Sequence, residues 1–231
     1  MKFFADRVIS FNKQLEFTGA LPKSISIMNP FKAKDANAIS SSFYKKYYSD
    51  NNDRYLILGI NPGRLGAGIT GVPFTDPKRM IEKCKINFKG DLKHEPSSAF
   101  IYEMIDAYGG IEEFYSRFYI NSVCPLGFTF INKKGKDVNY NYYDNAALEK
   151  IMRAFIIENI KKQIAIGVST DTVFCFGTGK NENFLRKLNA EKKFFRNIIA
   201  LEHPRYIMQY RSKNKAFYID KYISSFMKLS K

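Results

Sequence analysis

Cysteine is scarce in this chain of 231 residues, which holds only Cys84, Cys124 and Cys175. An odd number of cysteines without CxxC spacing does not fit a disulfide framework, a zinc site or a four-cysteine iron–sulfur cluster. Chains without a disulfide pattern are typical of a reducing compartment, so we expect this protein to be cytoplasmic.

Long apolar runs are also absent, and no stretch approaches the length that crosses a bilayer, so we expect no membrane partner. Residues 1–11 are apolar but include Asp6 and Arg7, which favours an amphipathic helix over a signal peptide. The chain has no internal repeat and no long low-complexity linker, and its length suits one large domain. The sequence therefore predicts a single domain over residues 1–231.

Acidic residues are few relative to basic ones. The chain has 22 Asp and Glu against 37 Lys and Arg, which gives a formal net charge of +15. Such an excess attracts polyanions, and nucleic acid is the commonest polyanion in a cytoplasm. The alternative is that the charge serves solubility, as in lysine-rich proteomes. The charge therefore favours a nucleic-acid partner but does not identify one.

Four short apolar runs, each bounded by turn residues, predict buried parallel strands at 55–60, 118–124, 172–176 and 197–201. Helical spacing of apolar residues predicts helices at 145–166, 180–188 and 213–227. For the first of these helices we expect Asp144 as N-cap and Gly167 as the stop.

Strands that alternate with helices predict an α/β fold, here a three-layer α/β/α sandwich with a central, mostly parallel four-stranded sheet. In such sheets ligands bind beyond the carboxyl ends of the strands, so the loops that follow the strands are the candidate site.

The loop after the first strand, residues 59–74, contains five glycines and two prolines. It matches neither GxGxxG nor GxxxxGK[ST], and Pro62 and Pro73 lack the amide donors that phosphate-binding loops use. A structural glycine turn is the stronger alternative to a nucleotide site.

Two further loops carry polar candidates. Asn121 lies near the end of the second strand, where it is either a satisfied core amide or a group that faces a ligand. His203 follows the fourth strand and is one of two histidines; the other, His94, lies in a polar stretch and is expected to face solvent. The residues after His203 suit either a wedge into stacked bases or an ordinary helix start.

Taken together, the three loops resemble the uracil-DNA glycosylase superfamily, specifically its single-strand-selective monofunctional branch. Residues 59–63 resemble the first motif of that branch, and the match continues without a gap through 70–74. Asn121 followed by Cys124-Pro125-Leu126 resembles the base-reading strand, and His203-Pro204 resembles the last motif.

The order and separations of these motifs agree with the family. Weaker similarity covers most of the chain, including Asn29-Pro30 and residues 95–100. One departure is that family members usually continue His-Pro with Ser-Pro-Arg, where this chain has Arg205-Tyr206-Ile207.

The resemblance implies a role for each matching residue. Asn61 and His203 would be catalytic: Asn61 holds the attacking water, and His203 donates a hydrogen bond to uracil O2. Phe74 would stack on the flipped base, Asn121 would read its Watson–Crick edge, and Gly63 would leave room at C5. Ile60 completes the expected base-binding set. The expected DNA-binding residues are Arg64, Pro204, Arg205, Tyr206, Ile207, Met208 and Arg211.

The implied activity is that of a DNA-repair glycosylase, which hydrolyses the N-glycosidic bond of uracil, and of related deaminated or oxidised bases, in DNA. No metal or other cofactor is required, and we expect a monomer. No motif lysine is available to form a Schiff base, so the base should leave without strand cleavage.

Two other classes remain as alternatives: a non-catalytic nucleic-acid-binding protein on the same fold, and an α/β enzyme that acts on free nucleotides. The presence of Asn61, Phe74, Asn121 and His203 argues against the first, because a silent relative should have lost one of them.

Overall fold

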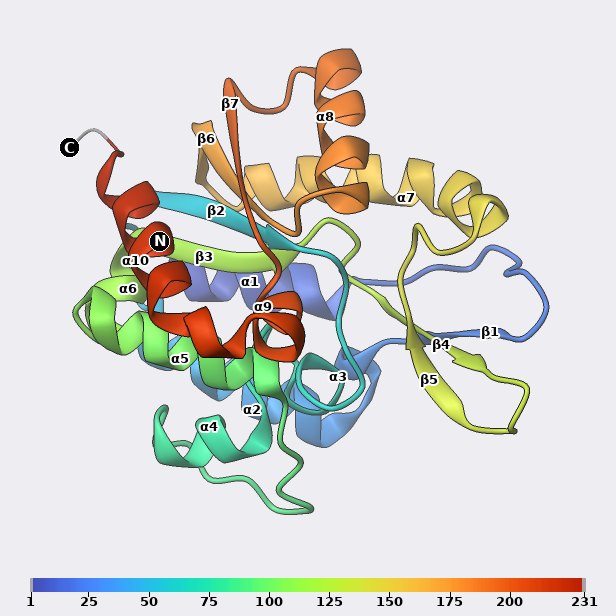
Figure 1. Cartoon of the computed structure of the whole chain (residues 1–231), viewed down its shortest axis with the longest axis horizontal. Helices are drawn as coiled ribbons and strands as arrows, with labels where there is room; N and C mark the ends of the chain where they lie inside the picture. The colour runs from blue at the N-terminus through green and yellow to red at the C-terminus, as the bar shows by residue number, and fades with distance from the viewer. Residues whose placement is uncertain (1, 230–231) are drawn as a thin grey trace.

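The computed structural model describes residues 2–229 (Figure 1). Met1, the first residue of the expected N-terminal helix, and residues 230–231 of the expected single domain lie outside the described residues. Near the N-terminus, the helix α1 (Phe4–Lys13) buries Phe4, Val8 and Phe11. Because one face is buried and the other is polar, the expected amphipathic helix is confirmed.

The centre of the molecule is a four-stranded sheet in which every neighbouring pair of strands is parallel, as predicted. In sheet order the strands are β3 (Phe118–Ser122), β2 (Arg54–Gly59), β6 (Val168–Phe176) and β7 (Asn197–Leu201). The strand β6 begins four residues before the predicted 172, because its pairing with β2 shifts register between Tyr55 and Leu56 and so takes in extra residues.

Helices cover both faces of this sheet, which confirms the three-layer arrangement (Figure 1). On one face, α10 (Lys215–Met227) places the rings of Tyr222 and Phe226 against Phe176 and Phe174 of β6. On the other face, α1 packs Phe4 against Tyr119 of β3. The remaining helices are η1 (Pro30–Lys32), α2 (Lys34–Tyr47), α3 (Ala67–Thr70), α4 (Pro77–Glu82), α5 (Pro96–Tyr108), α6 (Ile111–Arg117), α7 (Ala146–Ala165), α8 (Lys180–Lys192), α9 (Pro204–Tyr210) and η2 (Ser212–Asn214).

The start of α7 differs from the expectation. Its N-cap is Asn145, whose Oδ1 accepts hydrogen bonds from the backbone N–H groups of Ala147 and Leu148. The side chain of Asp144 instead accepts from the backbone N–H of Asn141, within the preceding turn, so it is not free to cap. The α7 helix does stop at Gly167, which adopts a φ of +104°.

A second, antiparallel sheet was not expected from the sequence. Its strands are β1 (Ile25–Met28), β4 (Gly127–Ile131) and β5 (Asp137–Tyr140), in the order β1-β4-β5, and they project from one side of the molecule (Figure 1). An added Cβ at Gly127 would lie 2.6 Å from the carbonyl oxygen of Pro62, so this glycine lets the small sheet press against the loop after β2. The small sheet therefore forms part of the wall around that loop.

No helix within residues 2–229 is both long and apolar enough to span a membrane.

Candidate functional site

A cavity of about 110 Å³ lies beyond the carboxyl ends of β2, β3 and β7. Six of the residues expected from the sequence line it together: Ile60, Asn61, Gly63, Phe74, His203 and Arg205. The remaining lining residues, which the sequence did not single out as site residues, are Pro62, Ala67, Pro73, Glu95, Ser97, Ser122, Asn139 and Asn141. Segments that are far apart along the chain thus meet in one place, as expected at the carboxyl edge of a parallel sheet.

Asn61 is held at both ends of its amide by the backbone that continues from β5. Its Nδ2 donates to the carbonyl of Tyr140 at 3.2 Å, and its Oδ1 accepts from the backbone N–H of Tyr142 at 3.3 Å. These two bonds fix which end of the amide faces which way. A carbonyl oxygen has two lone pairs, so Oδ1 can still accept one hydrogen bond from a water molecule.

His203 is both the N-cap of α9 and a wall of the cavity. Its Nδ1 accepts a hydrogen bond from the backbone N–H of Arg205 at 3.1 Å. Burial, together with the charge of Arg205, lowers the pKa of His203 to about 4. The imidazole is therefore neutral at physiological pH, and since Nδ1 is an acceptor, its proton lies on Nε2. The side chain can donate one hydrogen bond without carrying a charge.

Phe74 forms a flat apolar wall beside this histidine. Its ring centroid lies 5.5 Å from that of His203 and 5.8 Å from that of Phe176. Its φ is +53°, which is uncommon for a residue with a side chain. A Cβ at Gly59 would approach the Phe74 ring to 3.0 Å, so the glycine at the end of β2 leaves room for the ring. Because Phe74 lines the cavity, its ring is suited to stacking on a planar ligand there.

Glu95 contributes a carboxyl group to the cavity wall, and the sequence predicted no role for it. Its Oε1 lies 3.2 Å from the position of a Cβ at Gly63, so that glycine leaves room for the carboxyl group. Burial raises its pKa to about 7, with Asp76 raising it further and Arg205 opposing the rise. Between residues 2 and 229 its carboxyl group has no hydrogen-bond or ion-pair partner, so it is available to a ligand.

Asn121 is not among the residues that line this cavity. Its Nδ2 donates to the hydroxyl of Tyr119 at 2.7 Å, and its Oδ1 accepts from the backbone N–H of Ser122 at 2.8 Å. Neighbouring residues of a strand point to opposite faces, so Asn121 shares the face of Tyr119 while Ser122 lines the cavity. In this structure both ends of the Asn121 amide are engaged by its strand neighbours, and Ser122, not Asn121, is among the residues that line the cavity.

The expected DNA-binding residues divide by burial. Arg64, Arg205, Tyr206 and Arg211 are exposed, and Met208 is half-buried. Pro204 and Ile207 are buried, because they form the inward side of the first turns of α9. Those two residues support the helix and do not offer surface to a ligand. His94 is exposed, as expected.

No group of three or more His, Cys, Asp or Glu side chains is placed to hold a metal ion in the described part of the chain. The three cysteines are buried and free, and burial raises the pKa of each thiol to about 12.

Comparison with known proteins agrees with this geometry. The family model for the Uracil DNA glycosylase superfamily matches residues 45–226. The crystal structure of wild-type SMUG2 from Pedobacter heparinus superimposes with a TM-score of 0.96 at 63% sequence identity, covering 98% of each chain. No match was found among curated proteins. A chain with this fold, this cavity and these similarities belongs to the uracil-DNA glycosylase superfamily.

Proposed function

We propose that the protein removes uracil from DNA by hydrolysing the bond between the base and C1′ of the sugar, with Asn61 and His203 as its catalytic residues. The observation that carries this assignment is the pairing of a fixed amide with a neutral histidine in one cavity walled by an aromatic ring. Membership of the superfamily favours the same chemistry over the two alternatives, a silent binding protein and an enzyme of free nucleotides.

The charge that develops in the reaction explains the role of His203. As the C1′–N1 bond breaks, the sugar becomes oxocarbenium-like and negative charge accumulates on uracil O2. A neutral Nε2–H directed at O2 stabilises this charge, and a single preorganised donor of this kind is worth about 3 kcal/mol of barrier. Since Nδ1 is already engaged by Arg205, the donor needs no reorganisation during the reaction.

Asn61 would hold the water that attacks C1′. Its amide is a weak base, but an oxocarbenium ion needs little activation of its nucleophile. The two backbone bonds from Tyr140 and Tyr142 keep Oδ1 in one orientation, so the water is positioned before the bond breaks. The proton of the water passes to solvent after attack.

Base recognition would be shared between an aromatic face and polar groups. Phe74 stacks on the flipped ring, with Ile60 and Gly63 beside it. The hydroxyl of Ser122 contacts the polar edge of the base, a role that we assign to it in place of Asn121 because it lines the cavity. Asn121 acts as a positioning residue, since its Oδ1 holds the backbone N–H of Ser122.

DNA would lie across the exposed or half-buried side chains around the cavity mouth: Arg64, Arg205, Tyr206, Met208 and Arg211. Pro204 and Ile207 would act through α9, which they anchor. We further propose that the protein is a cytoplasmic monomer, that it needs no metal or organic cofactor, and that related deaminated or oxidised bases are secondary substrates.

A release assay separates the three function classes. The wild-type protein is incubated with single-stranded DNA and duplex DNA containing one uracil, and in parallel with free deoxyuridine monophosphate. We expect free uracil from DNA alone. Release from the free nucleotide at a comparable rate would support the nucleotide enzyme, and DNA binding without release would support the silent binding protein.

A further inference from the structure

An open groove of about 620 Å³ adjoins the catalytic cavity. It shares Ile60 and His203 with the cavity as a common wall. Three tyrosines from different parts of the chain line it: Tyr143 ahead of α7, Tyr206 on α9 and Tyr218 on α10. We call this surface the tyrosine groove. The proposed function gives Tyr206 a general DNA contact and leaves Tyr143 and Tyr218 without a role.

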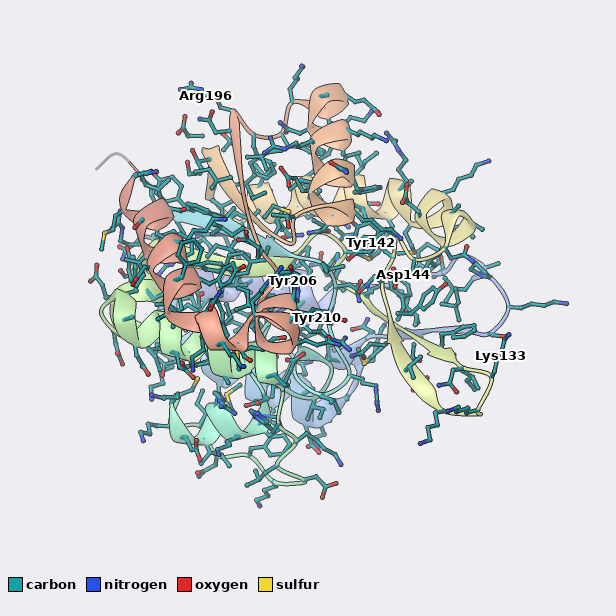
Figure 2. The ribbon with its side chains drawn as sticks, in the orientation of Figure 1. Lys133, Tyr142, Asp144, Arg196, Tyr206 and Tyr210 are labelled. Atoms are coloured by element: carbon teal, nitrogen blue, oxygen red, sulfur yellow. The ribbon has the colours of Figure 1, made fainter. Side chains whose placement is uncertain are left out.

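The rings of the tyrosine groove are accessible, and each has an aromatic neighbour. Tyr206 is 41% exposed, and the other two are partly exposed. Each ring packs against an aromatic neighbour: Tyr143 on Tyr142, Tyr206 on Tyr210 and Tyr218 on Phe217, with centroids 5.0, 5.5 and 5.3 Å apart. Figure 2 shows Tyr206 and Tyr210 together on α9. Partly exposed rings in one groove are suited to stacking on a planar ligand.

The charge around the tyrosine groove is suited to a polyanion. Arg211 lines the groove, and its Nε donates to the hydroxyl of Tyr206 at 3.3 Å. Lys180 lies over the Tyr143 ring at 5.9 Å. The acid in the lining, Glu202, is paired with Lys221 at 2.8 Å, so its negative charge is compensated. Aromatic rings interleaved with cations are the pattern that binds unpaired nucleic acid.

We propose that the tyrosine groove holds the nucleotide next to the uracil in the same strand, with its base unpaired and stacked on the tyrosines. The inference rests on the proposed function, which places the uracil on the other side of the His203 wall. Because that wall is common to both cavities, the occupant of the groove is an immediate neighbour of the flipped nucleotide. A neighbour that is base-paired cannot enter, so the groove favours single-stranded or locally open DNA over an intact duplex.

The test removes a base without removing the backbone. Single-stranded oligonucleotides carry one uracil, and the nucleotide on its 5′ or its 3′ side is replaced by a tetrahydrofuran abasic analogue. On one of the two sides, we expect the loss of the base to weaken binding at least about fivefold. The measured quantities are the half-saturating enzyme concentration in single-turnover excision and the Kd in fluorescence anisotropy. The analogue on the other side should change little.

Variants assign that effect to the tyrosines. Tyr143→Leu and Tyr206→Leu should weaken binding of the intact strand by a similar factor and should no longer respond to the abasic analogue. Phe3→Leu is the matched control, because Phe3 lies ahead of α1, is 48% exposed and does not line the groove. It should behave as wild type, and melting curves should show that all variants are folded.

Three results would overturn the proposal. In the first, the wild type is indifferent to the abasic analogue on both sides. In the second, the tyrosine variants lose the same affinity for intact and abasic strands, which would mean that the groove contacts the backbone. In the third, Phe3→Leu reproduces their loss. Failure of the proposed function looks different: no uracil would be released from any strand, while anisotropy would still measure the contribution of the tyrosines.

Discussion

The backbone N–H of Arg205 donates a hydrogen bond to Nδ1 of His203 at 3.1 Å, and this contact joins a helix cap to a catalytic donor. The same bond that begins α9 also determines which imidazole nitrogen carries the proton. Arg205 acts on the histidine a second time through its charge, which helps to lower the pKa of His203 to about 4. The fold thereby supplies a neutral donor at the cavity.

The first prediction concerns pH. The pKa of His203 falls from its usual 6.5 to about 4 on folding, so the neutral form persists at neutral pH and is lost as pH falls through about 4. Protonation of Nδ1 would also remove the acceptor for the Arg205 N–H, so stability should decline over the same interval below 6.5. We expect no acid limb assignable to His203 between pH 6 and 8, measured by single-turnover excision across pH.

Glu95 provides the control for that experiment, because its pKa of about 7 falls inside the measured range. Any inflection near pH 7 should disappear in Glu95→Gln, whereas the loss of rate toward pH 4 should remain. A limb near pH 6.5 that survives in Glu95→Gln would mean that His203 titrates normally, and the neutral-donor mechanism would be wrong.

The second prediction separates Ser122 from Asn121. Ser122→Ala removes the hydroxyl of a residue that lines the cavity and should lower kcat/KM for uracil by about tenfold with little change in melting temperature. Asn121→Ala leaves Tyr119 and the backbone of Ser122 without their buried partners, at a cost of about 1–3 kcal/mol of folding stability. Its melting temperature should therefore fall.

Asn121→Asp offers a stricter comparison of the same two residues. If the amide is structural, this variant should lose stability, and excision of uracil should fall only as far as Ser122 is displaced. A stable Asn121→Asp protein that has lost uracil excision and gained some excision of cytosine would instead show that Asn121 reads the base.

The sequence predicted the central sheet because buried parallel strands leave short apolar runs between turns, as at 197–201, which the structure reproduces as β7. It did not predict the small antiparallel sheet. The strands β1 and β5 have four residues each, and β5 is polar, so neither forms a recognisable apolar run. The strand β5 carries Asn139 to the cavity and leads into the backbone that fixes Asn61. The sequence therefore could not predict the contacts that hold Asn61 in place.

Some residues of the site could be predicted from their neighbours in the sequence, and others depend on how distant segments pack together. Asn61, Phe74 and His203 lie in loops with distinctive neighbours, so motif resemblance found them. Ser122 could have been found from strand alternation, because it lies on the opposite face from Tyr119 and Asn121. Glu95 had no such signal: its proximity to Gly63 depends on how the start of α5 packs against the loop after β2.

The third prediction follows from the formal net charge of +15. Affinity for undamaged DNA should fall steeply with salt, because counterions return to phosphates that the protein had neutralised. Anisotropy titrations between about 50 and 200 mM salt would measure the slope, with a neutral-backbone oligonucleotide analogue as control. A slope near zero would make the charge a solubility feature with no part in DNA binding.

The fourth prediction is that base removal leaves the DNA backbone whole. No lysine is among the residues that line the catalytic cavity in the described chain, so no amine is placed to attack C1′ and form a Schiff base. Product strands should break only after alkali, as seen on a denaturing gel. Borohydride-trapped protein–DNA adducts, or breaks without alkali, would identify a lyase.

The most direct test of the central claim is single-turnover release of uracil from DNA by the wild type, Asn61→Ala and His203→Ala, under conditions that saturate the substrate. Each substitution should slow release at least about a hundredfold, the scale of losing one preorganised polar group at the reacting centre. Loss of the N-cap should cost His203→Ala about 1 kcal/mol of stability, so it should remain folded. A folded variant of either residue that releases uracil at close to the wild-type rate would contradict the account.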